Sequence, residues 1–118
     1  EELKIRDKLV IVMQSEMGRT PNYNKGNGKD HWSIGSAMFL GPGIKGNRVV
    51  GKTDEGQFLL PLDPRTLQTT KEKDKSLRVR PEHLHLALRE FAGIAEHPFS
   101  RQFPFLIPED DRLRTFWG

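Results

Sequence analysis

Four side chains in the first third of the chain have types and spacing that suit metal or anion chemistry. Glu16 follows closely on an apolar run at residues 9–13, while Asp30 and His31 stand side by side after a Gly-rich approach. Carboxylate and imidazole donors together suit Zn, Mn or Fe and are less typical of Ca. Arg19 lies in the same segment, and its guanidinium can bind a phosphate, sulfate or carboxylate group through two hydrogen bonds.

Each of these side chains also has an ordinary structural interpretation. Glu16 could be a solvated loop carboxylate, and Arg19 could pair with a neighbouring acid. Asp30 and His31 could lie on the surface while Trp32 packs in the core. Because adjacent residues rarely face one ion, only one of Asp30 and His31 is expected to be a direct ligand, and two or three ligands do not complete a zinc site.

The elements that would position these residues can be predicted from apolar patterning. The run at residues 9–13 is typical of a strand covered on both faces of a mainly parallel sheet, and chemistry would then follow its C-terminal end. Polar, turn-forming residues predict a long loop at 15–33. Further short strands are expected at 36–40 and 48–50, and another short apolar run lies at 58–60. A helix is expected from Pro81, and Gly93 can end it.

Several other patterns exclude familiar chemistries. The chain has no Cys, so it can form neither a disulfide nor a thiolate metal site. The GxGxxG pattern at residues 41–46 is not followed by a helical pattern and is rejected as a dinucleotide site. No serine elbow is present, and His83 and His85 are expected to be packed or surface residues of the helix.

Composition describes one domain at most, rich in turns. The 118 residues include 11 Gly and 8 Pro, and no apolar run is long enough to span a bilayer. The net charge of +3 with a pI near 9.4 is weak support for a nucleic-acid partner, and the basic residues at 71–80 lack interleaved aromatic rings. The start at Glu1 and Glu2 suits an excised or processed piece of a longer protein.

The motifs also carry a family resemblance over most of residues 5–95. They occur in the order SEMGRTP, GKDHW, GPGIKG and GKTDEG, and the sequence PEHLHLALREFAGI fits a closing helix. In this order they resemble the C-terminal part of a bacterial family of sulfatase-like proteins, a domain of unknown function whose members often carry twin-arginine export signals. That family is similar to the alkaline phosphatase superfamily.

The resemblance implies roles for particular residues. Glu16 stands where the superfamily has the Asp of an Asp-His metal pair, and His31 stands where it has a later metal-binding His. Met17 replaces the His of that pair, which puts a complete two-metal site in doubt. Asp30 and Arg19 would be a supporting acid and an anion-binding or structural cation, and the nucleophile would lie outside this chain.

The sequence therefore predicts an α/β protein, the C-terminal portion of an alkaline-phosphatase-like fold with a few-stranded, mainly parallel sheet, flanking helices and long loops. Residues 1–95 would form the C-terminal part of the hydrolase domain, with a Pro- and aromatic-rich tail at 96–118 packing on it. The expected function is the metal-binding segment of a phosphatase- or sulfatase-like hydrolase, and the alternative is a non-catalytic binding or assembly module.

The same interpretation names the partners. Glu16 and His31 would hold a divalent ion, whose identity stays open among Zn, Mn, Ca and Mg. The remainder of the parent chain or a complementary fragment would complete the site, and the substrate would be a small anionic ester. Neither a nucleic acid nor a membrane span is expected, and the resemblance implies a periplasmic or exported protein.

Overall fold

The computed structural model describes residues 4–117, which form two compact units. The first unit runs to Asn47 and includes Thr53–Leu59. The second consists of Arg48–Lys52 and the chain from Leu60 onward. The boundary predicted after residue 95 falls within the second unit.

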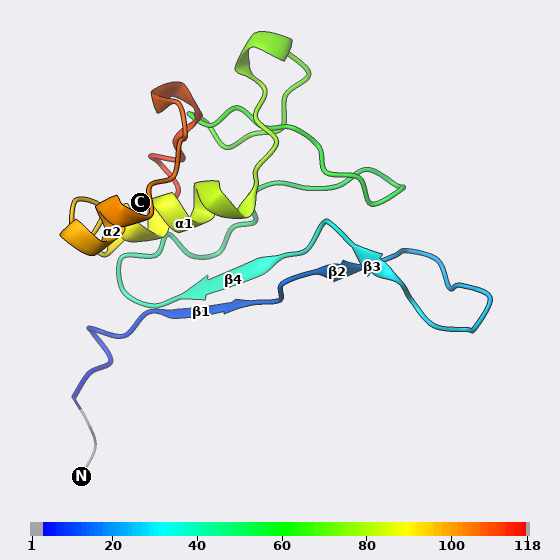
Figure 1. Ribbon diagram of the computed structural model, residues 1–118, viewed down its shortest axis with the longest axis horizontal. Coiled ribbons are helices and arrows are strands. Elements are labelled where there is room, and N and C mark those ends of the chain that lie inside the picture. Colours follow the sequence, from blue (N-terminus) through cyan, green and yellow to red (C-terminus); the bar gives the residue numbers. More distant parts are fainter. Residues whose placement is uncertain (1–3, 118) are drawn as a thin grey trace. The chain divides into compact units, whose positions relative to one another are not determined.

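The first unit is built on antiparallel strand pairs (Figure 1). Strand β1 (Ile11–Gln14) pairs with β4 (Ala37–Leu40), and β2 (Gly18–Arg19) pairs with β3 (His31–Trp32). The sequence predicted mainly parallel strands, whereas both described pairs are antiparallel. The chain turns back through the loop after β2, which brings β3 and then β4 alongside the strands that precede them, without the long crossover that parallel pairing needs.

The first strand also differs from its prediction in burial. Ile11 and Val12 retain 45% and 37% of their surface exposed, so β1 is not covered on both faces by the described residues. The apolar run reflects the strand itself, since β-branched residues favour extended backbone. The runs at 48–50 and 58–60 form no strand of their own; Thr53 and Leu59 make an isolated antiparallel bridge.

The second unit contains helix α1 (Pro81–Phe91), as the sequence predicted. Pro81 occupies the first helical position, where its missing N–H costs nothing, and Gly93 follows the helix with φ of +69°. The N–H of Arg80 donates to Nδ1 of His83 at 3.0 Å, which satisfies a backbone group at the helix start. His83 is therefore a packed residue, as expected, while His85 is exposed.

The core of the second unit is formed by α1 and chain segments on either side of it. Two short helices, α2 (Pro98–Gln102) and the 3-10 turn η2 (Glu109–Asp111), interrupt the final segment, and the 3-10 turn η1 (Lys73–Lys75) precedes α1. The indole N–H of Trp117 donates to the carbonyl of Ala87 at 2.8 Å. The buried apolar side chains are Leu62, Leu67, Leu77, Ala87, Ile107, Leu113 and Trp117. Within residues 4–117, no helix has the length and apolar character needed to cross a membrane.

Candidate functional site

The β2–β3 ribbon places two of the predicted site residues directly opposite each other. Arg19 and His31 are register partners, and directly opposed residues of an antiparallel pair share one face. Both side chains are exposed. The guanidinium of Arg19 donates to the carbonyl of Lys29 at 3.3 Å, which ties the side chain to the loop that enters β3. The arrangement presents two groups able to bind an anion side by side.

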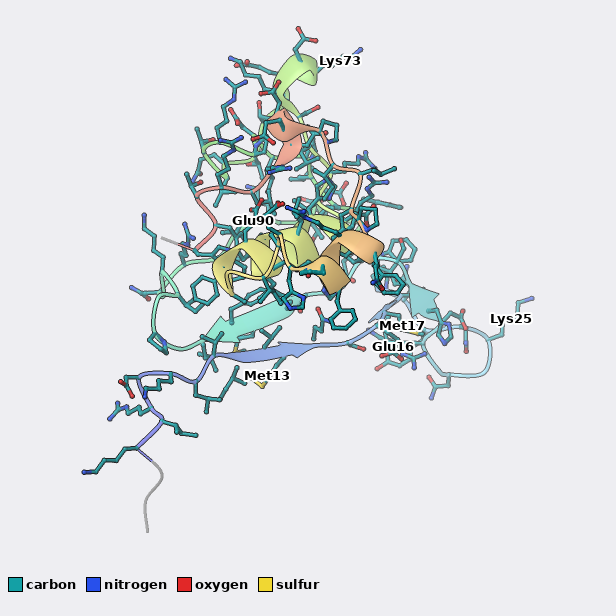
Figure 2. All side chains as sticks on the ribbon, turned by 60° about the vertical axis from the view of Figure 1, so that its left-hand side comes forward. Met13, Glu16, Met17, Lys25, Lys73 and Glu90 are labelled. Atoms are coloured by element: carbon teal, nitrogen blue, oxygen red, sulfur yellow. The ribbon has the colours of Figure 1, made fainter. Side chains whose placement is uncertain are left out.

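Glu16 lies in the short segment between β1 and β2, beside Met17 (Figure 2). Its pKa is lowered, first by a hydrogen bond with its own backbone and then by the Ser15 hydroxyl, which donates to the carboxylate at 3.3 Å. The positive charge of Arg19, and that of His31 when its imidazole is protonated, lower the pKa of Glu16 further. A glutamate is ionised at neutral pH even at its ordinary pKa, and the lowered pKa of Glu16 extends this cation-binding form to more acidic solutions.

Asp30 belongs to the other face of the same ribbon. Successive residues of an extended strand point to opposite faces, so Asp30 shares its face with Trp32 and not with His31. The N–H of Thr20 donates to the carbonyl of Asp30 at 3.1 Å, and the N–H of Asp30 donates to the Thr20 hydroxyl at 3.1 Å. The structure thus places Arg19 and His31 opposite each other, with Glu16 near enough for their charges to affect its pKa, and puts Asp30 on the other face of the ribbon.

The Asp30 face lines a pocket of about 480 Å³. Loop residues that follow β2, β3 itself and the turn at residues 55–58 contribute to its walls. Sequence reasoning missed this pocket, because Tyr23, Glu55 and Phe58 are dispersed along the chain. The GKTDEG motif was a usable signal, since an Asp-Glu-Gly sequence between two short apolar runs is typical of a hairpin turn.

Gly18 is required where β2 passes β3. A Cβ built at this position would lie 1.8 Å from the carbonyl oxygen of Ile34, a backbone atom. Only glycine permits so close an approach, so Gly18 is a structural requirement of the ribbon that carries Arg19.

Glu16 and His31 could supply only part of the coordination shell of a divalent ion. Glu16 and His31 offer a carboxylate and an imidazole, which are suitable donors for a transition metal. Residues 4–117 contain no cluster of three or more His, Asp or Glu side chains that could hold an ion. Glu16 and His31 would therefore supply two positions of a coordination shell that needs other donors.

Comparison with known proteins gives a family but no activity. A family model described as "Protein of unknown function (DUF1501)" matches residues 2–83. The match covers more than half of the 118 residues, and the chain belongs to this family. No curated protein and no solved structure gives a significant match.

Proposed function

We propose that this chain is the metal-binding segment of a hydrolase that acts on phosphate or sulfate esters. The observation that carries the proposal is the grouping of Glu16, Arg19 and His31 around the β2–β3 ribbon. Arg19 and His31 are register partners, and the charges of both lower the pKa of Glu16. Two residues selected from sequence as metal- or anion-binding therefore lie opposite each other, and both are near enough to the third, Glu16, to affect its pKa.

Each of the three side chains has a distinct task in this proposal. Glu16 stays ionised and, with the unprotonated nitrogen of His31, holds a divalent ion among Zn, Mn, Ca or Mg. A bound ion would polarise the ester and stabilise the negative charge that develops on its oxygen. Arg19 binds a phosphate or sulfate oxygen and orients the ester, because its planar guanidinium can donate two parallel hydrogen bonds to such a group.

The nucleophile and the remaining metal donors would come from the rest of a parent chain or from a complementary fragment. An alkaline-phosphatase-like fold and a periplasmic or exported location belong to the same proposal. Both derive from the sequence motifs that resemble sulfatase-like proteins.

Calorimetric titration of the chain with ZnCl₂ and with MnCl₂ tests the metal site. Glu16→Gln and His31→Gln should each lower the affinity about tenfold or more, because each removes a direct ligand. His85→Gln is the matched control, since it removes an exposed histidine of α1 in the second unit. Equal affinity in wild type and in both site variants would contradict the proposed ligands.

A non-catalytic binding or assembly module is the second candidate. The observation that favours it is Met17, a half-buried thioether at the position where the superfamily resemblance implies a histidine ligand. Assays of the complete parent protein with aryl phosphates and aryl sulfates separate the two candidates. Turnover that Glu16→Gln and His31→Gln abolish supports the hydrolase, whereas ester binding without turnover supports the binding module.

A further inference from the structure

We propose that the pocket on the Asp30 face of the β2–β3 ribbon binds a small organic cation, with a quaternary ammonium group as the chemistry it fits best. This inference goes beyond the ester hydrolase and does not depend on it. The pocket volume of about 480 Å³ lies in the range of small-molecule sites. It is formed entirely by residues of the first unit.

Three aromatic rings line the pocket. Trp32 and Phe58 pack at 5.3 Å between ring centroids with a 60° tilt, so their faces point in different directions. Tyr23 and Phe58 are 68% and 56% exposed, which leaves ring surface available to a ligand. Ring faces carry partial negative charge and attract ammonium groups within about 6 Å of the centroid. The ring of Tyr23 already attracts the ammonium group of Lys29, whose Nζ lies 5.3 Å from the ring centroid.

The charged side chains of the pocket wall are both acidic. Asp30 and Glu55 contribute two carboxylates, and no Lys or Arg of the part of the chain that the structure describes lines the pocket. When Lys29 is counted, two carboxylates and one ammonium group still give a formal charge of −1. Figure 2 shows Lys25 at the outer end of the loop, extending away from the ribbon. The wall therefore favours a positive ligand over a negative or neutral one.

Hydrogen bonds inside the loop argue against a neutral, hydroxyl-rich ligand. The Thr20 hydroxyl donates to the carbonyl of Asn22 at 2.9 Å and accepts from the N–H of Asp30. The Asn24 side chain accepts from two backbone N–H groups and donates to Asp30 at 2.8 Å. A sugar needs several donors as well as acceptors in the wall. The ionised carboxylates can only accept, so the Asn22 amide, the second Asn24 amide N–H and the Tyr23 hydroxyl are the side-chain donors that remain.

The same hydrogen bonds make the pocket largely preformed. Asn24 holds the loop on one side. On the other, the indole N–H of Trp32 donates to the carbonyl of Gln57 at 3.0 Å, and Asp54 accepts from the N–H of Phe58 at 2.9 Å. A wall fixed before binding loses little conformational freedom when the ligand arrives, which favours affinity.

The test uses the indole N–H signals of the two tryptophans in ¹⁵N-labelled full chain. Choline should shift the Trp32 signal in a saturable way. The signal of Trp117 should not move, because its N–H is held by Ala87 in the second unit. 3,3-Dimethyl-1-butanol has the shape of choline without its charge, and it should bind at least about tenfold more weakly.

Two substitutions and a control complete the experiment. Tyr23→Leu and Glu55→Gln should each weaken choline binding about fivefold or more, since one removes a ring face and the other a carboxylate charge. Phe99→Leu should leave choline binding unchanged, because Phe99 belongs to the second unit and is 70% exposed. Equal binding of choline and its neutral analogue, preferential binding of a methyl glycoside, or no shift of Trp32 would each overturn the proposal.

Discussion

Among residues 4–117, His83 is the one titratable side chain that is buried. Only 3% of its surface is exposed. Burial disfavours the charged imidazolium and lowers the pKa of His83. Its Nδ1 also accepts a hydrogen bond from the N–H of Arg80, which requires that this nitrogen carry no proton. Protonation would therefore disturb both the packing and the start of α1.

The pH dependence of stability follows from this depressed pKa. Above the unfolded-state pKa of about 6.5 His83 is neutral in both states, so its contribution to the stability is complete. As the pH falls below about 6.5, the unfolded chain takes up a proton that the folded chain does not. The free energy of unfolding then decreases, by at most about 1.4 kcal/mol per pH unit, until the lower folded-state pKa is passed.

Urea unfolding between pH 7.5 and pH 5, followed by the indole N–H signal of Trp117 in the ¹⁵N-labelled chain, measures this effect. His83→Gln should flatten the dependence, because glutamine can accept the same helix-start hydrogen bond without titrating. His85→Gln, which changes an exposed histidine of the same helix, should retain the wild-type slope. A His83→Gln profile parallel to that of wild type would show that another group causes the loss.

At the scale of the elements, the β2–β3 ribbon depends on Gly18. Gly18→Ala places a methyl group against the carbonyl of Ile34, so β2 and the segment that follows β3 must move apart. We expect a loss of roughly 1–3 kcal/mol in the stability of the ribbon. The measurement is amide hydrogen exchange at Thr20, whose N–H donates to Asp30 across the ribbon.

Gly46→Ala is the matched control for this substitution. It lies in the same unit, and a Cβ at Gly46 would meet nothing within 4 Å. Its exchange at Thr20 should equal that of wild type. Equal exchange in Gly18→Ala and Gly46→Ala would mean that the ribbon does not require a glycine at position 18.

Some of the helices and strands could be predicted from the sequence, whereas the pairing of the strands could not. Helix α1 was predictable because Pro81, an amphipathic pattern and Gly93 are local signals that agree. The positions of two strands were also predictable from apolar runs. The antiparallel pairing was not, since it depends on how the loop after β2 returns the chain, and apolar runs alone do not encode direction.

The candidate site shows the same division. Glu16, Arg19 and His31 were found from residue type and motif order, and their proximity depends on a register that sequence reasoning did not assign. Asp30 and His31 were expected to include only one direct ligand because the two are adjacent, and adjacency in an extended segment does place them on opposite faces. The pocket was missed since Tyr23 and Phe58 meet only through tertiary structure.

At the scale of the whole molecule, burial is unequal between the two units. All the buried apolar side chains described above, from Leu62 to Trp117, belong to the second unit. The first unit is held mainly by strand pairing and loop hydrogen bonds, and Ile11, Met13 and Leu40 are exposed. Apolar burial is the main stabilising contribution in folding, so the second unit should be the more stable of the two.

Hydrogen exchange of the intact chain measures this difference. Amides of α1 that bond within the helix should exchange at least about tenfold more slowly than the paired amides of β1, because their exchange requires the core to open. The comparison should be made after correction for intrinsic exchange rates. Equal protection in α1 and β1 would show that the two units open together.

The alternation of side chains along β3 has one more consequence. The face to which each side chain of β3 points is set by its pairing with Gly18 and Arg19, and it does not depend on the length of the loop at residues 21–28. Natural variants could lengthen or shorten that loop without disturbing Arg19 and His31. A single inserted residue inside the paired segment would instead turn Asp30 toward Arg19 and His31 toward the pocket. The two faces therefore stay distinct only while the number of residues in this short paired segment is unchanged, whatever the length of the loop before it.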